Sequence, residues 1–325
     1  MANIPPGSLS YITLGAETAW GTLAAATAGR KIAIVGEELD GSVEQLQSDS
    51  FSGDANSKDA VDGDIDAGGS FRHNLTLESA PIFAKAITRS LASTGTTPDF
   101  VHTAKTIAGA LPSYTIETYL ALDTPKFKIL PGCTFDTKGF EIRNKGFFQV
   151  QCGVVGKKVN ALASVSNFTT PDDWTGGTEL HHRLLTAANI KMDGAPVGRI
   201  TRLQVNIAND VDRDLRSLDS AGERIGVSAG IQRVTGNVDV WFDDPATFLD
   251  KAIAGTLVAF DFTWTISAVR SLQLVLPRVK LQVSYPKAST PKSLALSLPF
   301  TASKDTVEGS QIKFVIKNGI EGTKY

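Results

Sequence analysis

The sequence predicts a mainly β protein, made of antiparallel sheets and organised as two tandem domains with one short helix each. Three observations predict this fold class. Apolar and polar residues alternate with a period of two along many segments. Two short helical segments have the same internal spacing of apolar residues. The patterns around those helices recur roughly 160 residues apart, which is the size of a domain and not of a solenoid repeat.

Period-two alternation is the signal for most of the expected strands. Apolar residues at every second position, with polar residues between them, are typical of strands buried on one face only. A further strand over 147–155 follows Asn144-Lys145-Gly146, a turn sequence that tolerates positive φ. The clearest alternating sets are Leu203, Val205, Ile207; Val238, Val240, Phe242; Leu272, Leu274, Leu276; and Leu294, Leu296, Leu298.

Two short helices interrupt the strands. The first is expected to begin near Ser79 and the second near Asp244, each with proline in the first turn, where its missing N–H removes no helical hydrogen bond. Each helix has one apolar face that can pack on a sheet. These faces are Ile82, Phe83, Ala86, Ile87 in the first helix and Phe248, Leu249, Ala252, Ile253 in the second.

The matching helices indicate an internal duplication. The segment 69–75 before the first helix resembles 236–242 before the second, and each half has a strand that runs into a Leu-Pro step, at Pro131 and Pro277. We therefore expect a first domain over 1–165 and a second over 166–325, joined within the polar segment 164–179. The alternative is that two similar β-rich domains share short patterns by chance.

Composition bounds the function and the compartment. The 325 residues carry a formal net charge of −2, so a basic footprint for nucleic acid is absent overall. Residues 1–66 hold three basic and eleven acidic residues (3 − 11 = −8), which leaves +6 for the remainder and favours contacts between copies. No apolar run is long enough for a membrane span, and the N-terminus does not read as a secretory signal. The two cysteines, Cys133 and Cys152, are expected to be buried free thiols of a protein that folds in a cytoplasm.

The longest irregular stretch is expected at residues 48–69. It is acidic, with Asp49, Asp54, Asp59, Asp62, Asp64 and Asp66 among small residues. The spacing of Asp62, Asp64 and Asp66 resembles a calcium loop, but the sixth position is Ala67 and the twelfth is His73, where such a loop needs Gly and Glu. The sequence therefore favours a long, solvated acidic loop, and a loop of this length is either functional or disordered.

No motif raises catalysis above background. The pair His181-His182 has no supporting metal ligand, and no nucleophile elbow, phosphate loop or dinucleotide motif occurs. We expect neither an enzyme nor a cofactor, although catalytic triads can assemble from distant residues. A carbohydrate-binding or hydrolase β-sandwich is the alternative from another class. Its aromatic platform is not suggested by the scattered Trp20, Trp174, Trp241 and Trp264.

Several short patterns, in this order, resemble one family. The opening Gly15-Ala-Glu17-Thr18-Ala-Trp20-Gly21-Thr22, the step Pro131-Gly132-Cys133 and the strand 146–152 resemble the first half of tail tube (major tail) proteins from phages with long non-contractile tails. Val234-Thr235-Gly236, Leu276-Pro277 and Leu298-Pro299-Phe300 resemble strands of a second half. Each pattern alone suits any β protein, so the signal lies in their order and in the duplication.

This resemblance implies a β-sandwich with a flanking helix in each domain, whose strands contribute to a barrel around a lumen. Single-domain members close a ring with six copies, so a duplicated chain is expected to form a homotrimeric ring. The implied location is the virion tail, assembled in the host cytoplasm. The implied partners are further copies of the chain and the tape measure, tail terminator and distal tail proteins, while DNA passes through without specific binding and no membrane is involved. The alternative within this class is another virion ring protein, such as a contractile-tail inner tube or a tail completion protein.

Two surfaces are assigned from the sequence. The acidic loop over 48–69 is the candidate arm between stacked rings, and its alternative is a surface loop without partners. An acidic or neutral wall repels phosphates, whereas a basic wall binds them. The polar faces of the first strands of each half are therefore candidates for the lumen, and the alternative is that they face outer solvent. These candidates are Glu38, Asp40, Glu44, Gln204, Asn206, Asp210 and Asp212.

Overall fold

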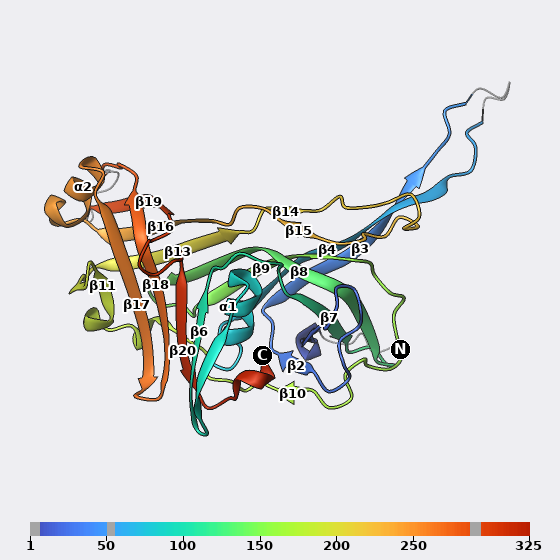
Figure 1. Ribbon diagram of the computed structural model, residues 1–325, viewed down its shortest axis with the longest axis horizontal. Helices are drawn as coiled ribbons and strands as arrows, with labels where there is room; N and C mark the ends of the chain where they lie inside the picture. Colours follow the sequence, from blue (N-terminus) through green and yellow to red (C-terminus); the bar gives the residue numbers. More distant parts are fainter. Residues whose placement is uncertain (1–6, 51–55, 287–293) are drawn as a thin grey trace.

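The protein is mainly β, as the alternation of its sequence predicts (Figure 1). The computed structural model describes residues 7–50, 56–286 and 294–325. The first half of the chain contains β1 (Tyr11–Ala16), β2 (Gly29–Ile32), β3 (Gly36–Leu46), β4 (Val61–Asn74), α1 (Ala80–Thr88), β5 (Ala92–Thr96), β6 (Asp99–Lys105), β7 (Ser113–Leu120), β8 (Lys126–Arg143) and β9 (Gln149–Gly156).

The second half begins after a long surface segment that pairs briefly with β2. Single 3₁₀ turns occur at Gly7–Leu9, His182–Leu184, Ala187–Asn189 and Gly322–Lys324. The surface segment contains β10 (Asp172–Asp173). It is followed by β11 (Ile190–Met192), β12 (Ala195–Pro196), β13 (Ile200–Ala208), β14 (Val211–Asp212), β15 (Ser228–Ala229), β16 (Arg233–Trp241), α2 (Pro245–Ile253), β17 (Leu257–Ser267), β18 (Arg270–Leu281), β19 (Ala295–Ala302) and β20 (Lys313–Asn318).

Both helices begin where the sequence predicts. Ser79 precedes α1, which ends at Thr88; the next residue, Arg89, has a left-handed φ of 70°, and its backbone N–H donates the last helical hydrogen bond to the carbonyl oxygen of Lys85. Asp244 precedes α2 and caps it by accepting a hydrogen bond from the backbone N–H of Ala246. The apolar face of α1 is buried completely, but Ile253 at the end of α2 is 54% exposed. The two helices therefore differ in what covers them, although their sequences match.

The two halves have the same strand order. In the first half the neighbours are β2–β1–β7–β8–β9–β4–β3, and in the second half they are β12–β11–β17–β18–β19–β16–β13. All of these pairs are antiparallel. The register shifts by one residue between Tyr114 and Ile116 of β7, where β8 carries the extra residue, and again between Val258 and Phe260 of β17, where β18 carries it. The repetition of order, direction and bulge supports the duplication, while the boundary at 165/166 stays a prediction.

The two halves join edge to edge. Residues 137–143 of β8 pair with residues 202–208 of β13, without a register shift. One continuous sheet therefore runs β3–β4–β9–β8–β13–β16–β19 across both halves. A second link forms because β6, part of a β5–β6 hairpin inserted after α1, pairs with β20.

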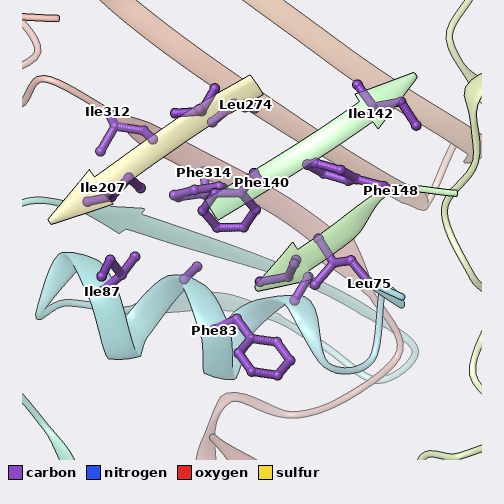
Figure 2. Close-up of a cluster of buried hydrophobic side chains, with 14 of the residues drawn as sticks. Leu75, Phe83, Ile87, Phe140, Ile142, Phe148, Ile207, Leu274, Ile312 and Phe314 are labelled. Atoms are coloured by element: carbon purple, nitrogen blue, oxygen red, sulfur yellow. The ribbon is translucent and has the colours of Figure 1, made fainter. Parts of the chain in front are cut away.

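An apolar core fills the space beneath this junction (Figure 2). Phe140 of β8 lies against Phe314 of β20, with ring centroids 5.4 Å apart. Phe148 stacks on Trp264 of β17 at 4.5 Å. Aromatic pairs of this kind add to the hydrophobic contribution of their buried area. The halves thus share one core, so the junction is a packed interface and not a flexible hinge.

The predicted irregular stretch over 48–69 is wrong for its last part. Residues from Val61 onward belong to β4, which pairs with β3 to form a long hairpin that projects from the body (Figure 1). Residues 47–50 and 56–60 belong to no strand, and residues 51–55 lie outside the described residues. A period-two signal was present, because Val61, Gly63, Ile65 and Ala67 alternate with three aspartates, but glycine and aspartate are rare in strands.

Candidate assembly surfaces

One face of the continuous sheet is covered by α1 and the core, and the other face is polar. Opposed residues on neighbouring strands form rows across this polar face. The rows are dominated by amides, hydroxyls and glycine. One row is Arg72, Gln151, Gly139, Asn206, Thr235 and Thr301, and the next is Asn74, Gln149, Glu141, Gln204, Asn237 and Pro299.

Around Glu141 two carboxylates balance two guanidinium groups, because Arg202 also lies 3.7 Å from the carboxylate of Asp239. Glu141 accepts hydrogen bonds from Arg143 and Arg202, each at 2.6 Å. Burial alone would raise the pKa of Glu141, but the two guanidinium groups outweigh it and hold that pKa below its ordinary value. The carboxylate therefore stays ionised at neutral pH. The result is a hydrophilic surface with little net charge where both halves contribute.

Four of the seven predicted lumen residues share this face. Gln204 and Asn206 lie on β13, and Glu38 and Asp40 lie on β3 opposite Ser70 and Gly68.

The other three predicted lumen residues lie away from the continuous part of the sheet: Glu44 is in β3 as expected but on its projecting part, whereas Asp210 and Asp212 lie beyond the end of β13. Whether any of the seven faces a lumen stays a prediction. Glu44 belongs to the projecting hairpin, beyond Ala67, where β9 stops pairing with β4. The strand through Gln204 ends at Ala208, and Asp210 has a φ of 52°, which turns the chain away. Asp210 and Asp212 consequently leave the sheet before they can line its face.

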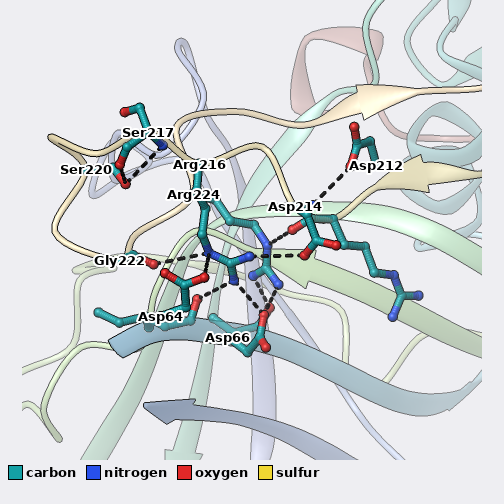
Figure 3. Close-up of polar contacts among 12 residues, drawn as sticks. Asp64, Asp66, Asp212, Asp214, Arg216, Ser217, Ser220, Gly222 and Arg224 are labelled. Atoms are coloured by element: carbon teal, nitrogen blue, oxygen red, sulfur yellow. Dashed lines mark hydrogen bonds and ion pairs between the residues drawn. The ribbon is translucent and has the colours of Figure 1, made fainter. Parts of the chain in front are cut away.

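A long connection of the second half forms ion pairs and hydrogen bonds with the β3–β4 hairpin of the first half (Figure 3). It spans residues 209–232, between β13 and β16, and corresponds in position to the tip of the β3–β4 hairpin. Its Arg216 donates to the carboxylate of Asp66 at 2.9 Å and lies 3.5 Å from that of Asp64. The backbone N–H of Ile65 also donates to the carbonyl oxygen of Gly222.

Arg224 is the deepest residue of this contact. Only 4% of it is exposed. Its guanidinium donates to the carbonyl oxygens of Arg213, Ala67 and Gly156 and to the carboxylate of Asp66. Burial lowers the pKa of Arg224, with the charge of Asp66 opposing that effect. One side chain thus ties the connection to β4 and β9 of the other half.

These contacts separate the predicted arm residues into groups. Asp64 and Asp66 pair with arginines of the same chain. Asp49, Asp59 and Asp62 are exposed along the projecting hairpin, and Asp54 lies outside the described residues. The calcium-like spacing of Asp62, Asp64 and Asp66 lies along an extended strand, and no group of side chains that could hold a metal occurs in residues 7–50, 56–286 and 294–325.

The sheet has an open border at each end. Within the described residues, β3 pairs only with β4, so its outer edge has no strand beside it. At the other end β18 pairs with β19 through residues 279–281, the N–H of Gln282 adds one hydrogen bond to the carbonyl oxygen of Pro299, and residues 282–286 form no strand. Unpaired strand edges are groups that natural proteins cover or complete.

Comparison with protein-family models decides the assignment. The model described as "Phage tail tube protein" matches residues 7–302, nearly the whole chain. The chain belongs to the phage tail tube protein family. A search of curated proteins found no match to it.

For this tail tube protein, the mainly β fold and the structural role expected from the resemblance are therefore confirmed, and the family places it in the virion tail. In the described part of the chain, no helix is long and apolar enough to cross a membrane. The arginines of the 209–232 connection were not predicted from the sequence. The signal was three of them, Arg213, Arg216 and Arg224, within one polar segment opposite an acidic one.

Proposed function

We propose that copies of this tail tube protein close into a ring, that rings stack into a tube, and that the tube conducts DNA during ejection. The supporting observation is the edge-to-edge junction of the two halves, which makes one sheet continue from repeat to repeat. A heterologous contact that repeats the same step closes a ring. Because each chain carries two repeats, three chains provide six.

The polar face of the continuous sheet is the proposed lumen wall. Its two rows are mostly amides and hydroxyls, and Arg143 and Arg202 are balanced by Glu141 and Asp239. Within the described residues Arg72 is the exposed cation of these rows that forms no ion pair, so the wall offers phosphates few unpaired cations. Strong binding to DNA needs cations that replace condensed counterions. A wall of this kind lets DNA slide without specific binding. Glu38, Asp40, Gln204 and Asn206 are the predicted lumen residues that we retain.

The β3–β4 hairpin is the proposed contact between stacked rings. It projects from the body, and the connection over 209–232 braces its base through Arg216 and Arg224 (Figure 3). Its outer part exposes Asp49, Asp59 and Asp62 together with the apolar Leu46 and Val61. An exposed apolar strip between carboxylates fits a protein surface better than bulk water. Tape measure, terminator and distal tail proteins, and assembly in the host cytoplasm, belong to the same proposal.

The ring proposal is tested by imaging and weighing the purified protein. We expect electron microscopy to show rings or tubes with a central channel, and native mass spectrometry to show a trimer as the smallest closed species. A chain that stays monomeric at high concentration, and also after addition of preformed tail tips as initiators, would contradict the proposal.

The stacking role is tested by shortening the hairpin. Residues 47–60 are replaced by an Asn-Gly turn, which suits a two-residue hairpin between Leu46 and Val61. We expect rings to form and the melting temperature to change little, because the described residues of the removed segment, 47–50 and 56–60, are exposed, but tubes to disappear from micrographs. Tubes of normal length from this variant would rule out the hairpin as the stacking arm.

A further inference from the structure

The junction inside one chain serves as a template for the junction between two chains. The repeat assigns a counterpart to each residue. Gly69 of β4 corresponds to Gly236 of β16, and their partners on the preceding strands are Leu39 and Val205, so β3 corresponds to β13 with a shift of 166 (205 − 39). The partners of the same two glycines on β9 and β19 are Val154 and Phe300.

The correspondence between β8 and β18 is obtained in the same way. Val154 lies opposite Phe135 on β8, and Phe300 lies opposite Leu281 on β18. The shift from β8 to β18 is therefore 146 (281 − 135). The bulged pair gives the same value independently, because Tyr114 lies opposite Cys133 and Val258 opposite Val279 (279 − 133 = 146).

The in-chain junction has a defined register. Ala208 of β13 lies opposite Thr137 of β8, and Ile207 lies opposite Lys138. One residue further, the backbone N–H of Asn209 donates to the carbonyl oxygen of Asp136 at 2.8 Å. In an antiparallel pair, residues alternate between hydrogen-bonded and non-hydrogen-bonded positions. Ala208 and Thr137 therefore occupy a non-hydrogen-bonded position.

We propose that the outer edge of β3 in one molecule pairs antiparallel with residues 282–286 of a second copy, in the register of the β8–β13 junction. Applying the two shifts puts Val43 opposite Gln282, Ser42 opposite Val283 and Gly41 opposite Ser284. This inference rests on the proposed ring and names the surfaces that close it. Every residue from Asp40 to Val43 and from Gln282 to Tyr285 is at least partly exposed in the single chain. The backbone N–H of Gln282 already donates to the carbonyl oxygen of Pro299, so the pair of Val43 with Gln282 uses the Val43 N–H and the Gln282 carbonyl oxygen, as Asn209 and Asp136 do inside the chain.

The edge of β3 marks where this ladder ends. The backbone N–H of Leu39 already donates to the carboxylate of Glu37 at 2.8 Å. Lys128, which pairs with Glu37, donates to the carbonyl oxygen of Leu39 at 2.5 Å. The residue that would face Leu39 is Pro286, which has no N–H to donate. Leu39, whose backbone N–H and carbonyl oxygen are already hydrogen-bonded within its own chain, thus faces Pro286, which cannot complete a hydrogen-bonded pair. The ladder between the two molecules therefore ends at this position.

The side chains near the junction agree with this pairing. Inside the chain, the amides of Asn209 and Gln232 are buried and both donate toward the carbonyl oxygen of Ile87. The shift places Val43 at the position of Asn209. The neighbouring strand β4 corresponds to β16 with a shift of 167 (236 − 69), and this shift places Ile65 at the position of Gln232.

The helices correspond by 166 because their matching apolar faces start at Ile82 and Phe248 (248 − 82), so Ile87 corresponds to Ile253. Val43 is 47% exposed and Ile253 is 54% exposed in the single chain. Between molecules, an apolar contact of Val43 with Ile253 takes the place of the buried amides. This contact also accounts for the difference in burial between the two helices: the end of α1 is covered by its own chain, whereas the end of α2 is covered only when a second molecule binds.

A cysteine pair tests the register. The variant carries Ser42→Cys and Val283→Cys, and the native Cys133 and Cys152 do not interfere because both are fully buried. Residues opposed at a non-hydrogen-bonded position have Cα atoms about 4.5 Å apart, within the range that a disulfide spans. We expect mild oxidation to give a head-to-tail ladder on a non-reducing gel, ending at a closed trimer. The matched control is Val43→Cys with Val283→Cys, whose side chains point to opposite faces, and we expect on the order of tenfold less cross-linking from it.

The outcomes separate this inference from the ring itself. Rings in micrographs with no 42–283 cross-link, or with a stronger 43–283 cross-link, would overturn the register and leave the ring proposal standing. Absence of rings would overturn both. A second variant, Val43→Asp, is expected to lower association by at least about tenfold by putting a charge into the apolar contact, whereas Val307→Asp, at a residue 92% exposed, is expected to associate normally. Normal assembly of Val43→Asp would also overturn the inference.

Discussion

Replacing Arg224 with alanine is expected to release the 209–232 connection from the hairpin. The guanidinium donates to three backbone carbonyls and to Asp66, and it is buried, so its loss removes several charge-assisted hydrogen bonds at once. Such bonds contribute about 1.5–3 kcal/mol each, and we expect a loss of about 3–5 kcal/mol from this contact. The backbone N–H of Ile65, which donates to Gly222 across the contact, reports the opening directly. Its hydrogen exchange should accelerate at least about a hundredfold.

The matched variant for this experiment is Asp66→Asn. The Asp66 side chain is 65% exposed, and the amide oxygen of asparagine can still accept from Arg224. Exposed ion pairs contribute about 1 kcal/mol or less, so the exchange of Ile65 should accelerate by less than about tenfold. Equal effects of the two substitutions would show that the ion pair, and not the buried contact with the backbone, holds the connection.

The sequence predicted the elements whose signals are local. Alternation located the strands that contain Leu203 and Leu272, because each is buried on one face by its own half. Ser79 and Asp244 located the helix starts, since proline in the first turn and the preceding polar residue act within a few residues. The duplication was visible for the same reason, as each half repeats those local signals.

Features that depend on partners distant in sequence were not predictable. The hairpin strand β4 is extended because β3 and the 209–232 connection flank it, and no local preference of Asp and Gly indicates this. Nor does the sequence of β8 state that β13 will pair with its far edge. Lys138 is a middle case. The residues beside Lys138 in the sequence are polar and indicate an exposed segment. Phe140 and Ile142, two and four residues later, nevertheless lie on the same face of the strand and place Lys138 on the buried face.

Lys138 gives the second large effect. Its side chain is fully buried, and Nζ donates to the carbonyl oxygen of Phe83 at 2.8 Å and lies 4.3 Å from the centre of that ring. Burial lowers the pKa of Lys138 from 10.5 to about 8. Between about pH 8 and 10.5 the folded chain therefore holds fewer protons here than the unfolded chain, and stability rises with pH across that window. Below pH 8 both states are charged, and the folded state carries the whole cost of a buried ammonium group.

Lys138→Met is therefore expected to stabilise the protein at pH 7. The lowered pKa corresponds to roughly 3 kcal/mol of cost for the charged side chain in the folded state, from which the lost hydrogen bond and ring contacts must be subtracted. We expect the free energy of unfolding in urea to increase by about 1–3 kcal/mol at pH 7, and the advantage to shrink as the pH approaches 10. Lys317→Met, at an exposed position of β20, should change stability little at either pH. A Lys138→Met protein less stable than the parent at pH 7 would mean that the contacts with Phe83 outweigh the cost of burial, so that this lysine stabilises the core beneath the junction of the two halves.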